Sequence, residues 1–570
     1  MLVEREVIKN VWSQVGDSME EKNQPKRIGN LVAPATIDYV WAITSDEVMD
    51  EDLLFRIVEY PFENRERKQV GIVLGQIEKV FTQNEFMNPW DKRGKAHVSF
   101  IAKYGELPHV RESMDKKVMK IRNLLYYDGK TISSSLKNSP YTGVDIHFAD
   151  TKTLNLFYPW KFPQTGAIGY SKGSNYPFPL DLSLLCFMNT LVVAGIGHGK
   201  THIGALLAAL LHIAGKKVLV IDPTGQWAMT ANPELKEKPL QVDLSTFKPA
   251  IFYGEKIKPD IEDILNFYFP KTIDWQSIFP TTSSDKRETI KTNVYTILSR
   301  FLSMKGKIEF KDFGEILIAA ASTQTPLSLS ELGIPAMGPI WKEQEDTERN
   351  LRLALMNLNR YRDDFNMNIR DKLANVLTFE NIVKEFESGK LTIVDLSSIP
   401  DDDEKSLIAK KIEDYVFNKA LEEYKRTHKE YVYNACIFVE EAHRFLPEFP
   451  EGDQQIKCQK AFIKGAREGR KYGLGHIFID QRFVGLSKEA LQTQTYVLGR
   501  LTTPGDISAL ESVVGKDIAL AVQRTVPKKT FIVTGVASSL SNQPCEIEVF
   551  SNIDELVNNL KEFGGYGKGS

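Results

Sequence analysis

In the carboxyl-terminal part of the sequence, short apolar runs alternate with stretches of helical periodicity. The runs are apolar on both faces, which is typical of strands in a parallel sheet covered by helices on each side. They are NTLVVAG, KVLVID, LTIVDL, CIFVE, HIFID, YVLGRL and TFIVTG. Between the second and third runs, about 261–388, helical periodicity dominates, for example in TIKTNVYTILSRFL and TERNLRLALMNLNRYR. The pattern predicts an α/β core with a helical insertion.

The amino-terminal part follows a different pattern. From about residue 32 to residue 147, β-rich pieces such as VWAIT, VGIVLGQIEKV and AHVSFIAKYGEL are separated by charged and Gly/Pro/Asn-containing turns. This favours a small β-barrel or sheet domain. The Gly/Pro/Ser/Asn-rich stretch at 165–181 marks a junction. The predicted organisation is an extension at 1–26, a β-barrel at 27–164, an α/β domain at 165–540 with its insertion at about 261–388, and a C-terminal tail at 541–570.

Length and composition are compatible with this division. A chain of 570 residues exceeds the roughly 250–300 residues that one core supports. The 72 basic and 75 acidic residues give a net charge of −3, so contact with nucleic acid requires a local basic cluster. The four cysteines lack metal-ligand spacing and are expected to be reduced core thiols. Apolar runs shorter than the ~20 residues of a membrane span predict a soluble, cytoplasmic protein.

The segment AGIGHGKT, residues 194–201, lies between an apolar strand and an apolar helix. That order is the one that phosphate binding requires, because glycines let successive N–H groups point inward and the helix dipole favours negative charge. Lys200 is predicted to reach the β- and γ-phosphates of ATP, and the Thr201 hydroxyl to bind Mg²⁺. His198 is expected to be a solvent-facing spacer. The predicted nucleotide-binding residues are Gly195, Gly197, His198, Gly199, Lys200, Thr201 and His202.

A pair of carboxylates ends the strand in NACIFVEEAHRFLP, residues 434–447. In a P-loop ATPase the first, Glu440, would hold Mg²⁺ through water. The second, Glu441, would polarise the water that attacks the γ-phosphate. Two surface glutamates at a strand end would look the same in isolation, but the upstream Lys200 favours the catalytic interpretation.

A basic segment, KGAREGRKYGLGHIFIDQR at 464–482, precedes a further strand. Arg467 and Arg470 lie within about one helical turn, and Gln481 follows the strand directly. Because ligands of open α/β sheets bind at the carboxyl ends of strands, Gln481 is placed to sense the γ-phosphate or to orient water. The arginines could equally belong to a solvated helix end, and Gln481 could be a polar cap.

These three segments together resemble the HerA family of the HerA/FtsK superfamily, most clearly across about 165–514. VEEAHRFLP followed by REGRKYG is more specific than the P-loop alone. The resemblance implies a RecA-like P-loop ATPase core, preceded by a small N-terminal β-barrel. It also implies a homohexameric ring that translocates duplex DNA using ATP and Mg²⁺. Family members commonly act with a NurA-type nuclease, and Arg467 or Arg470 would complete a neighbouring subunit's site, with Arg500 as the reserve.

The sequence departs from the family after the second strand. The family usually has an Asp followed by a His-Gly-Glu-aromatic turn, whereas this chain has IDPTGQW. Asp222 and Gly225 match the pattern, but Thr224 and Gln226 do not. The loss of an acidic side chain at Gln226 puts the efficiency of coupling in doubt, whereas nucleotide binding is not affected.

Two other functions stay open at this point. The chain could be an ATP-binding assembly platform for a nuclease or defence effector, with little movement along DNA. It could also be a conjugation- or packaging-type coupling ATPase. Intact Lys200, Glu441 and Gln481 favour turnover, while Thr224 and Gln226 leave room for the platform.

Overall fold

The computed structural model describes residues 26–45, 52–64, 69–84, 115–136, 138–231, 243–489, 492–539 and 543–564. Packing divides the chain into two units. The first contains residues 1–220, 229–248 and 420–570, and the second contains residues 221–228 and 249–419. The expected extension at 1–26, except its last residue, and the β-rich piece AHVSFIAKYGEL lie outside the described residues. The predicted domain boundaries differ from this division and stay predictions.

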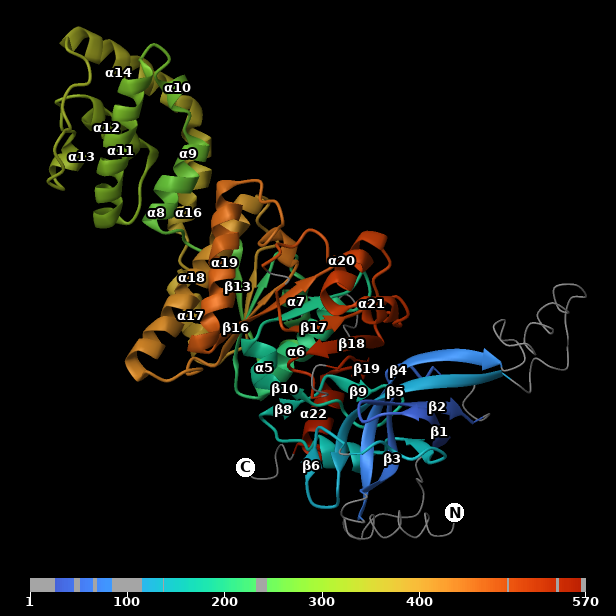
Figure 1. The fold of residues 1–570 in the computed structure, drawn as a ribbon. Coiled ribbons are helices and arrows are strands. Elements are labelled where there is room, and N and C mark those ends of the chain that lie inside the picture. The colour runs from blue at the N-terminus through green and yellow to red at the C-terminus, as the bar shows by residue number, and fades with distance from the viewer. Residues whose placement is uncertain are drawn as a thin grey trace, which may run out of the picture. The chain divides into compact units, whose positions relative to one another are not determined.

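The first unit begins with a closed antiparallel barrel. Its six strands follow one another around the barrel in the order β2, β1, β7, β3, β4 and β5, and pairing of β2 with β5 closes it (Figure 1). Alternate residues of β2 are buried, as expected of a barrel wall with a packed interior. The predicted barrel is confirmed. The strands are β1 Arg27–Ala35, β2 Tyr39–Thr44, β3 Ile57–Asn64, β4 Gln69–Asn84, β5 Asp115–Tyr127, the short β6 Ile132–Ser133 and β7 Asp145–Phe148.

The large sheet of the first unit places the predicted apolar runs side by side. β15, β16, β11 and β17 are adjacent and parallel, whereas β18, β19 and β9 continue the sheet antiparallel to their neighbours. The expectation of a parallel sheet is therefore wrong at β18, which pairs antiparallel with β17 after a connection that contains two helices. The strands are β9 Gly169–Ser171, β11 Thr190–Val193, β12 Lys217–Asp222, β15 Ala435–Val439, β16 Leu474–Asp480, β17 Thr495–Leu498, β18 Thr530–Gly535 and β19 Cys545–Val549, with a small separate pair of β8 Thr165–Gly166 and β10 Leu180–Asp181.

Helices α6 and α19 of the first unit both pack on β16. Helix α19 ends where Gly473 takes a left-handed conformation, φ 87°, and a β-carbon there would lie 2.6 Å from the Tyr431 main chain. Within the segment 541–570, expected as a tail, residues 545–549 form β19, which pairs with β18, and residues 553–562 form α22, which packs on α6. The helices are α4 Thr151–Phe157, α5 Leu182–Phe187, α6 Lys200–Ile213, α19 Asp453–Tyr472, α20 Pro504–Val514, α21 Lys516–Val522 and α22 Ile553–Glu562.

The second unit contains the helical insertion, which has an apolar core of its own. Phe269, Phe313 and Phe365 are fully buried there, and the ring centroids of Phe313 lie 4.9 Å and 5.3 Å from those of the other two (Figure 1). The predicted insertion is confirmed. The unit contains the parallel strands β13 Ala250–Tyr253 and β14 Thr392–Asp395, and the helices α8 Ile261–Asp263, α9 Phe269–Thr272, α10 Trp275–Ile278, α11 Ser284–Lys305, α12 Phe310–Ala321, α13 Leu327–Ser330, α14 Gln344–Leu358, α15 Arg362–Phe365, α16 Asp371–Ala374 and α17 Phe379–Glu387; α7 Gln226–Ala231 and α18 Asp402–Thr427 begin in it.

The surroundings of the cysteines agree with a further expectation. Cys186, Cys436, Cys458 and Cys545 are all buried and form no disulfide, which agrees with their interpretation as core thiols. Across the part of the chain that the structure describes, none of the helices combines the length and apolar character needed to cross a membrane.

One barrel carboxylate is buried, and no ion pair joins it to a cation among the described residues. Glu59 of β3 is 6% exposed, and burial raises its pKa from 4.5 to about 8. Between these two values the folded protein holds a proton on Glu59 that the unfolded chain has released. Stability gained from this proton is therefore complete below pH 4.5 and is lost as the pH rises through 8, at up to about 1.4 kcal/mol per pH unit.

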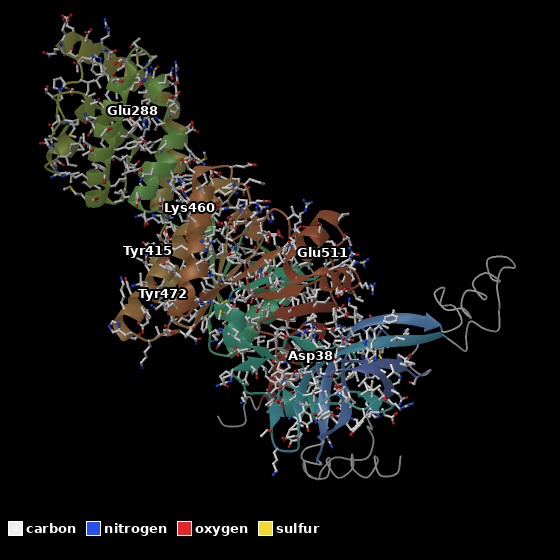
Figure 2. The ribbon with its side chains drawn as sticks, in the orientation of Figure 1. Asp38, Glu288, Tyr415, Lys460, Tyr472 and Glu511 are labelled. Carbon is white, nitrogen blue, oxygen red and sulfur yellow. The ribbon has the colours of Figure 1, made fainter. Side chains whose placement is uncertain are left out.

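We expect Glu59→Gln to reduce the decrease in melting temperature between pH 5.5 and pH 8, because the amide is neutral throughout. The melting temperature of both proteins is measured across this range. The control is Asp38→Asn, which alters an exposed carboxylate of the same barrel (Figure 2). An unchanged pH dependence in Glu59→Gln would show that Glu59 ionises in the folded protein much as it does in the unfolded chain.

Candidate functional site: a phosphate loop and its carboxylates

The loop between β11 and α6 has the curled backbone that its sequence predicts. Gly197 and Gly199 take positive φ values of 73° and 99°, and α6 begins at Lys200. A residue with a β-carbon is strained in this conformation. At Gly199, a β-carbon would in addition lie 3.2 Å from Cα of Lys528. The two glycines thus let the loop turn directly into the amino terminus of a helix, where anions bind.

Main-chain contacts hold the loop from two sides. The carbonyl of Arg500 accepts a hydrogen bond from the N–H of Gly195 at 3.0 Å and lies 2.8 Å from Nδ1 of His198, while the N–H of Lys528 donates to the carbonyl of His198 at 3.1 Å. His198 is half-buried, so the expectation of a solvent-facing spacer is wrong. Its ring fixes the loop to the main chain of Arg500, two residues after the end of β17.

His202 was predicted to bind nucleotide, but its ring has another partner. Nε2 of His202 lies 2.8 Å from the carbonyl oxygen of Phe550, which follows β19. Burial lowers the pKa of this imidazole, so a neutral ring is favoured. The side chain therefore ties α6 to the end of β19, and any contact of His202 with a phosphate would have to come from its main chain.

Lys200, Glu441 and Gln481 meet directly beside this loop. Nζ of Lys200 lies 3.1 Å from Oε1 of Glu441, and Nε2 of Gln481 donates to the same oxygen at 2.5 Å. Lys200 is 9% exposed and Glu441 is 5% exposed. The structure thus brings together the lysine, carboxylate and amide that were predicted from three separate segments.

The main chain at Glu441 is unusual for a glutamate. Its φ of 48° lies in the left-handed region, and a short 3₁₀ turn, Ala442–Arg444, follows it. Such a conformation costs free energy and persists where the surroundings enforce it, which is common at functional sites. Glu440, one residue earlier, is 1% exposed at the end of β15, and Thr201 is half-buried in the first turn of α6.

Asp480 connects the turns that follow β15 and β16. Its carboxylate is 1% exposed and accepts hydrogen bonds from the N–H groups of His443, Gln481 and Arg482 at 2.7, 2.7 and 3.1 Å. Nδ1 of His443 also lies 3.0 Å from Oδ2. This hydrogen bond raises the pKa of His443, against an opposing effect of burial.

The sequence predictions did not include Asp480 and His443 among the functional residues. Both carried a signal: Asp480 directly precedes Gln481 at a strand end, and His443 lies two residues after Glu441. What the sequence could not show is that the two turns face each other, which makes one carboxylate the acceptor for both.

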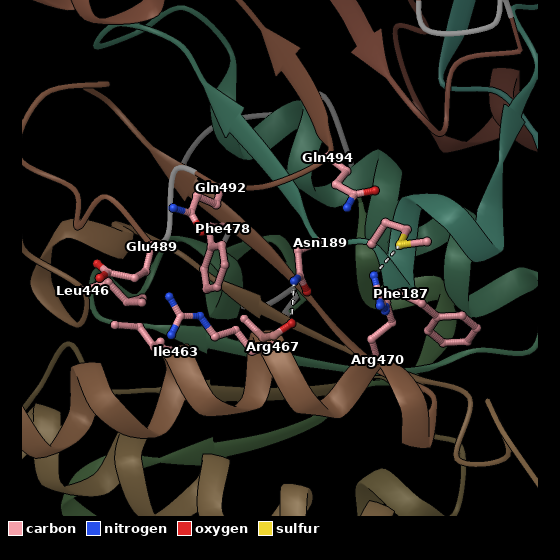
Figure 3. Close-up of a pocket in the computed structure, with 12 residues that line it drawn as sticks. Phe187, Asn189, Leu446, Ile463, Arg467, Arg470, Phe478, Glu489, Gln492 and Gln494 are labelled. Carbon is pink, nitrogen blue, oxygen red and sulfur yellow. Dashed lines mark hydrogen bonds between the residues drawn. The ribbon is translucent and has the colours of Figure 1, made fainter. Parts of the chain in front are cut away.

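Arg467 and Arg470 lie away from the phosphate loop of their own chain. They line a pocket of about 200 Å³ together with Asn189, which precedes β11, whereas the loop follows β11 at its other end. Asn189 donates to the carbonyl of Ala466 at 2.8 Å (Figure 3). Both arginines are exposed, and within the described residues neither makes an ion pair. The pocket is smaller than the roughly 300–1,000 Å³ of small-molecule sites.

The turn that departs from the family pattern keeps a regular geometry in the second unit. Oδ1 of Asp222 accepts from the N–H and hydroxyl of Thr224 at 2.8 and 2.7 Å, and Oδ2 accepts from the N–H of Trp227 at 2.8 Å. Gly225 has a φ of 78°, and a β-carbon there would lie 2.7 Å from the Ser397 hydroxyl. Thr224 thus supports the turn, and Gln226 is exposed.

The residues present fit a nucleoside triphosphate and its Mg²⁺. The loop leads into the amino terminus of α6, where anions bind. It also offers a buried ammonium, Lys200, whose present partner, Glu441, is an anion that a phosphate can replace. Thr201 and Glu440 offer the oxygen ligands that Mg²⁺ prefers. A second group, Glu441, His443 and Asp480, places three ligand-type atoms within 4.8 Å of one another. Because Asp480 is already occupied by N–H donors, we interpret that group as a hydrogen-bonded network.

This combination of loop, buried lysine and strand-end carboxylates defines a P-loop NTPase. Residues 167–416 match the family model described as "Helicase HerA, central domain". The sequence is 22% identical to the DNA double-strand break repair helicase HerA of Pyrococcus furiosus over 76% of this chain and 77% of that protein. It is also 22% identical to the protein of that name from Sulfolobus acidocaldarius, over 84% of each chain. The resemblance to the HerA family is thereby confirmed.

Solved structures also resemble this chain. The structure of VirB4 from Thermoanaerobacter pseudethanolicus matches with a TM-score of 0.40 and 14% identity, over 70% of this chain and 100% of the other. The bacterial conjugative coupling protein TrwB, without its first 70 residues, matches with a TM-score of 0.38 and 13% identity, over 71% of this chain and 92% of the other.

Proposed function

We propose that this protein is an ATP-driven DNA translocase that works as a homohexameric ring. The observation that carries the proposal is the convergence of Lys200, Glu441 and Gln481 beside the phosphate loop, since this set serves hydrolysis rather than binding alone. The relatives are named as DNA double-strand break repair helicases, which supports DNA as the substrate of movement. Duplex DNA and a NurA-type nuclease partner belong to the same proposal.

In this proposal ATP binds with its β- and γ-phosphates on the loop and on Lys200, while Thr201 and, through water, Glu440 hold Mg²⁺. The ion, when bound, neutralises charge on the phosphate oxygens. Glu441 accepts a proton from water as the water oxygen bonds to the γ-phosphorus. The bond from that phosphorus to the bridging oxygen breaks, and ADP leaves with the electron pair. Gln481 orients the water or Glu441.

The assembly-platform alternative rests on the departures at Thr224 and Gln226. Thr224, however, donates to Asp222 and keeps the turn ordered, so this departure does not by itself favour loss of turnover. A platform differs from a translocase in one measurable respect, which is whether free linear duplex DNA accelerates ATP hydrolysis.

We expect linear duplex DNA to raise the ATPase rate of the wild-type protein severalfold, and Glu441→Gln to abolish hydrolysis with and without DNA. The amide still accepts a hydrogen bond from Lys200 but cannot take a proton from water, a role worth roughly 10²–10⁴ in rate. Steady-state phosphate release is the measurement. A wild-type rate that DNA does not change would favour the platform, and near-normal turnover of Glu441→Gln would move the base to another residue, first to Glu440.

The two arginines of α19 are proposed to act across the subunit interface. Charge develops on the outer γ-phosphate oxygens during transfer, and an arginine there contributes roughly 10³–10⁵ in rate. Arg467 and Arg470 are exposed and lie near the amino end of β11, so neither is placed to serve the loop of its own chain. Arg500 differs, because its main chain contacts that loop directly.

We expect Arg467→Ala or Arg470→Ala, inactive alone, to regain part of the ATPase activity when mixed with the equally inactive Glu441→Gln protein. Mixed rings then contain interfaces with an intact glutamate on one side and an intact arginine on the other. Arg500→Ala is the matched control and should not complement Glu441→Gln, since both changes damage the same subunit's site. Subunit exchange is verified by pull-down of labelled subunits. If exchange occurs and only Arg500→Ala complements, Arg500 is the residue that acts in trans.

A further inference from the structure

The two carboxylate oxygens of Glu441 have unlike surroundings. Oε1 has two donors, Lys200 and Gln481, whereas Oε2 is buried and has no hydrogen-bond partner among the described residues. A buried polar atom without a partner costs free energy and is uncommon in native proteins. Nδ1 of His443 lies 3.6 Å from Oε2, just beyond hydrogen-bond distance.

Asp480 determines which way this donor points. Its Oδ2 accepts from the main-chain N–H of His443 at 2.7 Å and lies 3.0 Å from Nδ1 of the same residue. A carboxylate beside Nδ1 favours the tautomer that carries the proton there. The ring therefore presents an N–H on the side where both Asp480 and Oε2 of Glu441 lie.

We propose that His443 is a positioning residue that binds Oε2 of Glu441 once a triphosphate has drawn Lys200 away from Oε1. A small movement closes the gap of 3.6 Å, so that Asp480 and Oε2 share the N–H of Nδ1. The carboxylate is then anchored through Oε2, while Oε1, which has lost Lys200 but keeps Gln481 as a donor, accepts a proton from water. The proposal rests on the function proposed above, because it assigns a partner to the same catalytic glutamate.

The local main chain suits this role. Glu441 is held in the left-handed region, and the 3₁₀ turn Ala442–Arg444 keeps His443 close to it. Ala442, between the two, is fully buried, so the turn has little freedom to shift. Glu441 is 5% exposed, and its Oε2 lies towards His443 rather than towards solvent.

A structural role is the competing explanation, in which His443 merely satisfies Asp480. The two roles differ in what they affect. An anchor for Glu441 affects kcat and leaves nucleotide affinity and thermal stability unchanged. A structural bond to Asp480 affects the turns after β15 and β16 together, and so alters affinity and stability as well.

Three substitutions at position 443 separate these explanations. His443→Asn places an amide N–H near the position of Nδ1, His443→Gln places it near Nε2, and His443→Ala removes the donor. We expect kcat for ATP hydrolysis to fall about tenfold or more in the Ala and Gln variants and to stay within about threefold of wild type in the Asn variant. The dissociation constant for an ATP analogue with Mg²⁺, and the melting temperature, should stay close to wild type in all three.

A kcat of His443→Ala equal to that of wild type would overturn the proposal, as would equal losses in the Asn and Ala variants. A loss of nucleotide affinity that parallels the loss of kcat would assign His443 a structural role instead. Glu441→Gln is assayed alongside. If it is inactive while His443→Ala is fully active, only the positioning role fails; if Glu441→Gln itself turns over normally, the proposed catalytic function of Glu441 fails first.

Discussion

The ion pair between Lys200 and Glu441 is the interaction on which the site depends. Both charges are nearly buried, with Nζ and Oε1 3.1 Å apart. Leaving one member of such a pair without the other typically costs about 3–5 kcal/mol, so each holds its partner in place as long as nothing else can. A bound triphosphate is an anion that can take over Lys200. In the absence of nucleotide, Lys200 and Glu441 therefore neutralise each other, and a bound triphosphate takes the place of Glu441 beside Lys200.

The order of the strands in the sheet brings together three turns that are distant in the sequence. The phosphate loop follows β11 and the glutamate follows β15, while β16 lies between these strands and carries Asp480 and Gln481 at its end. Since parallel strands expose their carboxyl ends on the same edge, the sheet order alone places the three turns together. Asp480 then fixes two of them by accepting main-chain N–H groups from both.

The sequence predicted the elements of this site better than the contacts among them. The spacing of the glycines and the preceding strand were sufficient to predict the phosphate loop, and the paired glutamates were sufficient to locate the end of β15. Both predictions succeeded because each feature is determined by residues that are close in the sequence. The reversal at β18 and the role of Asp480 were missed, since each depends on which segments pair across the sheet. His198 was misjudged for the same reason: its partner is a carbonyl 302 residues away. Arg467 and Arg470 were identified from their segment, but only the fold shows that they line a pocket at the other end of β11.

The most direct test of this account is the affinity of wild-type and Glu441→Gln proteins for a slowly hydrolysed ATP analogue, measured by calorimetry. If nucleotide must displace Glu441 from Lys200, a neutral amide should compete less, and the variant should bind about fivefold more tightly, since a hydrogen bond to a charged acceptor is stronger by about 1 kcal/mol. Glu440→Gln, the same change one residue earlier, should bring no such gain. Equal or weaker binding by Glu441→Gln would contradict the claim that Glu441 competes with the nucleotide for Lys200.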